Sequence, residues 1–90
     1  MTYRIEFRPA ARRDLAKLDR FIASKVIADV ESLAENPRPA GVEKLEGGEK
    51  LCRVRVGPGK NYRAVYQILD EKLVMLVVKV GDRKDVYRGL

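Results

Sequence analysis

The feature that most constrains the fold is the run from Leu73 to Val80, in which Lys79 is the one charged residue and valine is the commonest. This run is far shorter than the roughly 20 apolar residues that span a bilayer. It is typical of a central strand that is buried on both faces. Such a strand needs neighbouring strands, so we expect a sheet with this run near its middle.

Two segments before this run alternate between apolar and other residues, which is the pattern of strands with one buried face. In residues 51–56 the apolar face carries Cys52, Val54 and Val56. In residues 61–69 it carries Tyr62, Ala64, Tyr66 and Ile68. We expect a turn at residues 57–60 and a tight hairpin at Asp70-Glu71 or Glu71-Lys72. The three segments then form an antiparallel meander.

The N-terminal part combines one strand with two helices. Residues 2–8 alternate, and Pro9 follows, where proline suits the first turn of a helix. A short amphipathic helix is indicated by Ala11, Leu15 and Leu18. Asp19 can cap a second helix, and Asn36-Pro37 ends it because the residue before proline avoids the helical region. The apolar stripe of this helix consists of Ile22, Val26, Ile27, Val30, Leu33 and Ala34.

The element order is β-α-α-β-β-β, which predicts a single α+β domain over residues 1–90. The sheet is expected to have four strands and to be mainly antiparallel, with the first strand joining the meander. A two-helix hairpin should cover one face of the sheet, because only one face of each outer strand is apolar. The other face stays partly open. Residues 37–50 are expected to be irregular.

The residue types that are missing exclude several kinds of chemistry. The 90 residues include no histidine and a single cysteine, Cys52. An intrachain disulfide, a histidine-based triad and a zinc site built on thiolates are therefore excluded, and we expect no metal and no cofactor. The sequence has no apolar segment of a signal peptide and no membrane span, so we expect a cytoplasmic protein whose thiol stays reduced.

The positive charge is concentrated in the strand-forming part of the chain. The net charge is +6, and residues 51–90 contribute nine Lys or Arg against four Asp or Glu, which gives +5. A basic surface of this kind suggests a polyanion or an acidic protein as the partner. Charge alone does not choose between them.

Arginines gather on the polar face of the predicted meander. Arg53 and Arg55 lie two residues apart on one strand, with Cα atoms roughly 7 Å apart, and Arg63 lies on the neighbouring strand. Arg83 and Tyr87 follow the central strand and could fold over the same end. Guanidinium groups donate paired hydrogen bonds to phosphate, so the cluster suits a phosphate group. The alternative is a solvated face with ion pairs, and for Tyr87 a packing role.

Several motifs carry a resemblance to a known family. They are FRPAARRDLAKL, LAENPRP and KLEGG in the first half, then YR-x-VYQI-x-D and VG-x-R-x-x-VY in the strand half. With these motifs the chain resembles the RelE/ParE superfamily of toxins from bacterial and archaeal toxin–antitoxin pairs, over nearly its whole length. The last two motifs are the specific ones. The combination of Arg63, Arg83 and Tyr87 is similar to the RelE-like branch.

The resemblance implies an endoribonuclease that cleaves mRNA in the ribosomal A site without a metal. The 2′-hydroxyl attacks the adjacent phosphate and leaves a 2′,3′-cyclic phosphate and a 5′-hydroxyl. By position, Arg63 resembles the arginine that braces the scissile phosphate, and Arg83 the one that stabilises or protonates the leaving group. Tyr87 resembles the tyrosine that orients or deprotonates the nucleophile. Arg53, Arg55 and Lys60 are expected to hold phosphate and RNA.

Two departures from the family pattern leave the proton acceptor open. Arg53 and Arg55 stand where the best-known RelE pattern has lysines, and arginine is a very poor base. Asp82 stands where other branches have a histidine. Its carboxylate is either a base or, as we favour, the ion-pair partner of Arg83.

The resemblance also implies partners. A RelB-like antitoxin from an adjacent gene should neutralise the toxin, and the ribosome and mRNA should be its targets. We expect no contact with a membrane and no DNA binding except through the antitoxin. The alternative function is that of a ParE-like toxin, which inhibits DNA gyrase and cleaves no RNA.

Overall fold

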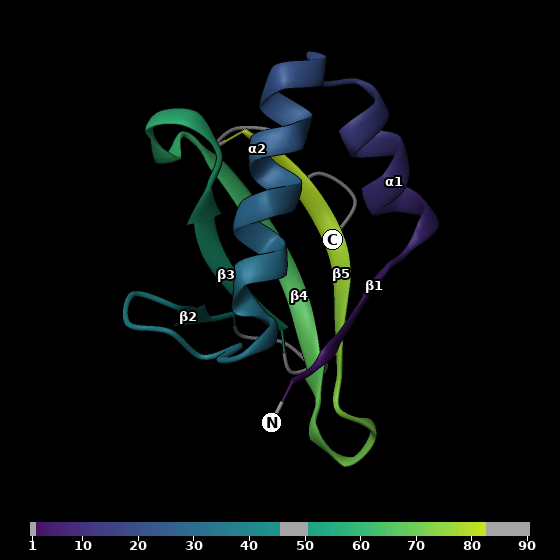
Figure 1. The fold of residues 1–90 in the computed structure, drawn as a ribbon, viewed down its shortest axis with the longest axis vertical. Coiled ribbons are helices and arrows are strands. Elements are labelled where there is room, and N and C mark those ends of the chain that lie inside the picture. Colours follow the sequence, from purple (N-terminus) through teal and green to yellow (C-terminus); the bar gives the residue numbers. More distant parts are fainter. Residues whose placement is uncertain (1, 46–50, 83–90) are drawn as a thin grey trace.

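The computed structural model describes residues 2–45 and 51–82, and within them two helices pack on one sheet (Figure 1). The longer elements are β1 (Arg4–Phe7), α1 (Pro9–Ala16), α2 (Arg20–Glu31), β2 (Glu43–Lys44), β3 (Leu51–Val56), β4 (Tyr62–Leu69) and β5 (Val74–Asp82). Short 3-10 turns lie at Ser32–Ala34, Pro58–Lys60 and Asp70–Lys72. The α+β fold and the order of helices and long strands agree with the sequence prediction.

The sheet has the strand order β1-β5-β4-β3-β2 in the described part of the chain. Strands β3, β4 and β5 form the predicted antiparallel meander, and β1 joins it parallel to β5. The predicted number of four strands was wrong, because β2 adds a fifth through the pairs Glu43–Arg53 and Lys44–Cys52. A strand of two residues is too short to show periodicity, so no alternation marks it in the sequence.

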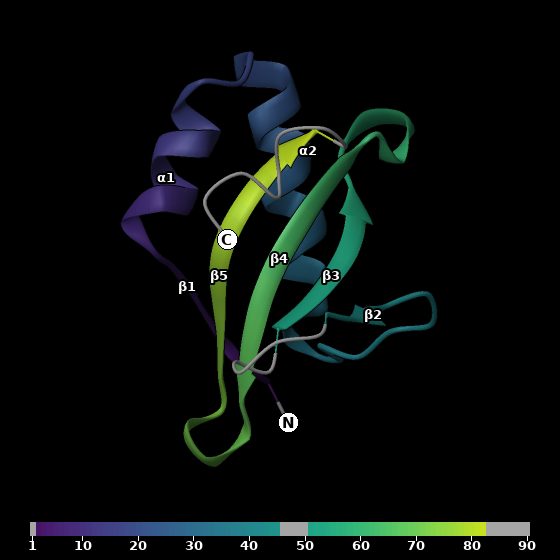
Figure 2. The ribbon, with the colours of Figure 1, turned by 180° about the vertical axis from the view of Figure 1, so that it is seen from behind.

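The two helices begin as the sequence predicted. Pro9 occupies the first turn of α1, and the Asp19 carboxylate caps α2 by accepting a hydrogen bond from the Phe21 backbone N–H at 2.9 Å. Both helices lie on the same face of the sheet (Figures 1 and 2). No helix of the described residues covers the opposite face.

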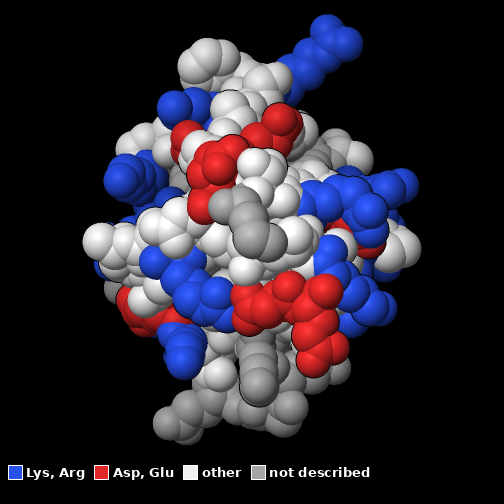
Figure 3. Space-filling model, turned by 60° about the horizontal axis from the view of Figure 1, so that its bottom comes forward, with Lys and Arg blue, Asp and Glu red and all other residues white. Residues whose placement is uncertain are grey.

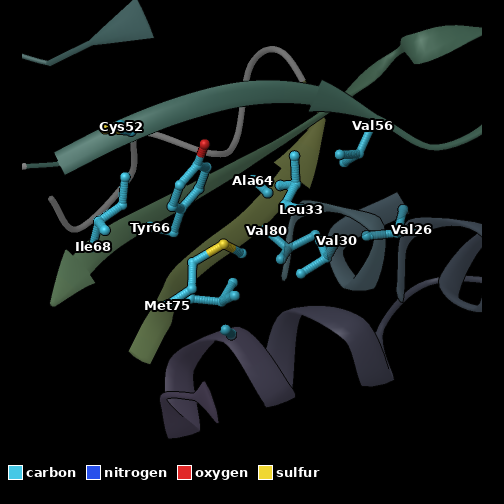
Figure 4. Packing of buried hydrophobic residues seen from close by; sticks show 12 residues of the cluster. Val26, Val30, Leu33, Cys52, Val56, Ala64, Tyr66, Ile68, Met75 and Val80 are labelled. Atoms are coloured by element: carbon cyan, nitrogen blue, oxygen red, sulfur yellow. The ribbon is translucent and has the colours of Figure 1, made fainter. Parts of the chain in front are cut away.

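The core lies between the helices and the sheet (Figure 4), and its largest fully buried side chain is that of Tyr66. The Tyr66 ring packs in the same cluster as Met75 and Val30. Its hydroxyl donates a hydrogen bond of 2.6 Å to the backbone oxygen of Pro37. Burial raises the pKa of the Tyr66 phenol. The hydrogen bond from Tyr66 to Pro37 ties the loop that follows α2 to the centre of the sheet.

The turn between β3 and β4 is fixed against α2. The Gly57 backbone N–H donates a hydrogen bond of 2.8 Å to the Asp29 carboxylate. Gly57 has φ +82°, and a Cβ there would lie 3.0 Å from the Tyr62 ring and 3.1 Å from Val26. Only glycine fits this close approach without strain. The anchored turn sets the positions of the strand ends beside it, where Arg55 and Arg63 lie.

The opposite end of the molecule carries mixed charge (Figure 3). Near the β4–β5 turn, the Arg38 guanidinium makes two hydrogen bonds to the Asp70 carboxylate, at 2.8 and 3.2 Å. The Tyr3 hydroxyl donates to the same carboxylate at 2.6 Å, which raises the pKa of the Tyr3 phenol. No helix of the described residues is long and apolar enough to cross a membrane.

Candidate functional site

Three arginines lie together on one face of the sheet. It is the face that the helices leave uncovered, and Figure 2 views the sheet from that side. Arg55 on β3 pairs directly with Arg63 on β4, and Arg53 pairs with Val65. Directly paired residues of neighbouring strands share one face, with Cβ atoms about 4.5–5.5 Å apart. As the alternation predicted, Arg53, Arg55 and Arg63 therefore occupy one face. Like charges in direct register destabilise a strand pair, so the arrangement favours binding of an anion.

One acidic residue joins this cluster, and sequence reasoning missed it. Both Nε and Nη2 of Arg53 donate hydrogen bonds to the Glu43 carboxylate, the first at 3.1 Å. The hydrogen bond from Arg53 lowers the pKa of Glu43, and the charges of Arg53, Arg55 and Arg63 lower it further. For Arg53, the ion-pair alternative therefore holds in this structure. The pairing of β2 with β3 brings Glu43 there, and a two-residue strand gives no signal in the sequence.

Arg63 lies in the middle of the arginine face. On one side it pairs with Arg55, and on the other with Gly81 of β5. Its guanidinium is partly buried and makes a long hydrogen bond of 3.5 Å to the Tyr62 backbone oxygen. Gly81 adds no side chain to this row, so Arg63 lies between a second arginine and a residue without a side chain. This position suits a phosphate group.

Lys60 lies at the tip of the β3–β4 turn and is exposed. It has φ +55°, a left-handed conformation that costs a residue with a side chain about 1–2 kcal/mol. Its backbone N–H donates to the Gly57 oxygen at 2.9 Å, which closes the turn. The turn thus presents a lysine at the end of the sheet where Arg55 and Arg63 lie.

Two of the candidate residues, Arg83 and Tyr87, lie outside the described residues. Asp82 is described, and it pairs with Tyr62, whose ring packs against the core. The register therefore puts Asp82 on the helix side of the sheet, whereas Arg63 lies on the other side. This placement disfavours Asp82 as a base at a phosphate that Arg63 holds.

Cys52 lies away from the arginine face. Its thiol is free and buried, and burial raises its pKa. It lines a cavity of about 650 Å³ together with residues such as Arg38, Ile68 and Asp70, near the mixed-charge end. None of the three arginines of the cluster lines this cavity. In residues 2–45 and 51–82, no three Cys, Asp or Glu side chains come together in a way that could hold a metal ion.

Comparison with known proteins gives consistent matches. Residues 5–87 match the family model described as ParE toxin of type II toxin–antitoxin system, parDE. The chain is 30% identical over 89 residues to the mRNA interferase toxin RelE of Escherichia coli K12. This alignment covers 97% of this chain and 92% of the relative. It is 33% identical over 93 residues to toxin RelG of Mycobacterium tuberculosis, covering 98% and 99% of the two chains.

The fold agrees with these matches. The structure resembles a chain of the intact Escherichia coli RelBE toxin–antitoxin complex, with a TM-score of 0.71 and 30% identity. This likeness covers 89% of the present chain and 95% of the other. Because the family model and the relatives each span nearly the whole sequence, the chain belongs to the RelE/ParE superfamily of type II toxin–antitoxin toxins, on its RelE-like branch.

Proposed function

We propose that this chain is the toxin of a type II toxin–antitoxin pair and acts as a ribosome-dependent mRNA endoribonuclease. The observation that carries the proposal is the set of three arginines on one sheet face, with Arg55 and Arg63 in direct register. The similarity to a relative named an mRNA interferase toxin supports RNA as the polyanion. Family membership and the basic surface both point to the same substrate.

The proposed reaction is an internal transesterification. The 2′-hydroxyl oxygen of one nucleotide forms a bond to the adjacent phosphorus, and the bond from phosphorus to the 5′-oxygen of the next nucleotide breaks. The products are a 2′,3′-cyclic phosphate and a 5′-hydroxyl. Negative charge builds up on the phosphorane, and fixed cations stabilise it most when they are already in place. The arginine face supplies such cations, and the proposal requires no metal.

Each site residue has a role in this proposal. Arg63 braces the scissile phosphate, because it stands in the middle of the row, between Arg55 and Gly81. Arg83 stabilises or protonates the leaving 5′-oxygen, and Tyr87 orients or deprotonates the 2′-hydroxyl. A tyrosine has an ordinary pKa of about 10, and nearby guanidinium groups favour its phenolate.

The remaining cations hold the RNA. Arg55 and Lys60 are exposed at the same end of the sheet, where they can contact phosphates that flank the cleaved one. Arg53 is hydrogen-bonded to Glu43, so an RNA phosphate must share or replace that carboxylate. Glu43 therefore lowers the affinity for RNA until the substrate displaces it.

The proposed protein partner is a RelB-like antitoxin. One similar structure is that of a RelBE toxin–antitoxin complex. With a net charge of +6, this chain favours an acidic partner that covers the arginine face. The antitoxin, not this chain, would carry any DNA binding. Because translating ribosomes lie in the cytoplasm, the toxin would act there.

A second candidate function is inhibition of DNA gyrase, because the family model that matches is the ParE one. This function needs neither Tyr87 nor Arg83 as a catalyst. It predicts that purified toxin blocks supercoiling by gyrase and leaves ribosome-bound mRNA intact. An assay of mRNA cleavage and an assay of DNA supercoiling therefore distinguish the two functions.

Primer extension on mRNA bound to purified ribosomes tests the proposed function. The wild-type chain should cut the message in the A site, and Arg63→Ala, Arg83→Ala and Tyr87→Phe should each slow cleavage by about 100-fold or more, as expected for lost electrostatic or acid–base catalysis. Lys72→Ala is the matched control, since Lys72 is exposed at the opposite end of the sheet. Intact mRNA at an excess of wild-type toxin would contradict the proposal.

A further inference from the structure

Lys79 breaks the alternation of β5. Met75 and Val77 point into the core, and a strict period of two would send Lys79 the same way. Instead Val80 is the next residue of the core cluster. Between the core residues Val77 and Val80 lies one residue more than strict alternation allows, Val78. The residues after Val78 therefore point to the face opposite to the one that alternation predicts.

The pairing with β4 shows the cause. Tyr66 pairs with Val77, but Val65 pairs with Lys79, so the register shifts by one residue at this point. This is a β-bulge, a device that re-aims a side chain and that recurs next to functional sites. Without the bulge, the amine of Lys79 would enter the apolar core. With it, Lys79 joins the face that carries Arg53, because Arg53 pairs with the same Val65.

Lys79 therefore extends the arginine face by one strand. One row across the sheet reads Arg53, Val65, Lys79, and the next reads Arg55, Arg63, Gly81. The two rows place four cationic residues on one face of three neighbouring strands. Lys79 lies diagonally across from Arg63, a spacing that long side chains can bridge.

Asp14 of α1 contacts this part of β5. Strand β1 pairs with β5 from Val74 to Val77, and among residues 2–45 and 51–82 no strand pairs with this edge of β5 beyond Val77. Asp14 accepts a hydrogen bond of 3.0 Å from the Val80 backbone N–H, and its other oxygen lies 3.7 Å from the Lys79 amine. The Lys79 side chain is 19% exposed, so it is mostly buried beside Asp14 and keeps a limited contact with solvent.

We propose that Lys79 is a phosphate-binding residue for the RNA substrate, which completes the site on the side away from Arg53. This inference rests on the proposed function. An ammonium group has three donors, and Asp14 can take one of them, which leaves donors for a phosphate oxygen. The bulge explains how a lysine fits between the core residues Val77 and Val80 of β5.

The salt dependence of binding separates a phosphate contact from a structural ion pair. Each phosphate contact on single-stranded RNA adds about 0.7 to the slope of log K against log salt concentration. We expect Lys79→Met to bind mRNA-programmed ribosomes about tenfold more weakly, the usual loss for one charge-assisted hydrogen bond, and to lower the slope by about 0.7. Lys79→Arg should keep the slope, because it keeps the charge.

Lys72→Met is the control for loss of a positive charge elsewhere, since Lys72 lies in the turn between β4 and β5. Figure 1 shows this turn at the far end of β5. It should bind with the wild-type slope. An unchanged slope for Lys79→Met, or an equal drop for Lys72→Met, would overturn the inference. If the wild-type chain fails to cleave ribosome-bound mRNA, the proposed function itself fails, so cleavage by the wild type is measured in the same preparation.

Discussion

Arg55 and Arg63 stand directly opposite each other on β3 and β4, in the same row of the sheet. Two like charges in this register repel each other in the free protein. Their proximity follows from the register of β3 and β4, and the turn that joins these strands is held by the hydrogen bond from Gly57 to Asp29. The pair is a local cost to folding that a bound phosphate would relieve.

Replacement of one of these arginines should therefore stabilise the protein. Arg55→Thr removes the repulsion, and we expect the free energy of unfolding to rise by about 0.2–1 kcal/mol at low salt. The gain should shrink near 1 M salt, where the Debye length is only about 3 Å. Urea unfolding at the two salt concentrations measures both values, and a gain that does not depend on salt would point to strand propensity instead.

Loss of Glu43 should strengthen RNA binding and change the response of stability to acid. Its pKa lies below the usual value of about 4.5, because Arg53 donates hydrogen bonds to the carboxylate. A lowered pKa gives stability that is present above pH 4.5 and is lost as the pH falls through the lower value. The melting temperature of the wild type should therefore fall more steeply below pH 4.5 than that of Glu43→Gln. Parallel curves for the two proteins would refute this role.

The Tyr66 hydroxyl should contribute measurably to stability. Tyr66→Phe keeps the buried ring but leaves the Pro37 oxygen without its hydrogen bond, at a cost of about 1–3 kcal/mol in the free energy of unfolding. Tyr3→Phe is the control, because the Tyr3 hydroxyl is at the surface, and it should cost less. Urea unfolding checks both.

The raised pKa of Tyr66 gives this prediction a second readout. The folded state favours the neutral phenol, so the stabilisation is present below pH 10 and is lost as the pH rises through the raised pKa. Above pH 10 the wild type should lose stability faster than Tyr66→Phe. An equal loss in the two proteins would show that another group titrates.

Gly57 should tolerate no side chain. Gly57→Ala forces a Cβ into a left-handed conformation at φ +82° and to within 3.0 Å of the Tyr62 ring, so we expect a loss of about 1–3 kcal/mol. Gly41→Ala is the matched control, with φ +90° but nothing within 4 Å of the added atom. Thermal unfolding should show the larger loss for Gly57→Ala. Equal losses would mean that backbone strain alone decides.

The sequence by itself determined the strands and helix starts that are marked by residues close together in the chain. The alternation in Leu51–Val56 predicted β3 with its observed bounds, and the proline and aspartate signals located the starts of both helices. The side-chain period of two also put Arg53, Arg55 and Arg63 on one face. These features depend on residues that are close in the chain, and periodicity reports them directly.

Only the tertiary structure decided which distant segments meet. The partner of Arg53, Glu43, stands in a strand of two residues, which is too short for any period. The parallel place of β1 beside β5, the bulge that turns Lys79 onto the arginine face, and the Asp14 contact all join residues far apart in sequence. Packing and hydrogen bonding at strand edges select such contacts, and the periodicity of residues within one segment does not predict them.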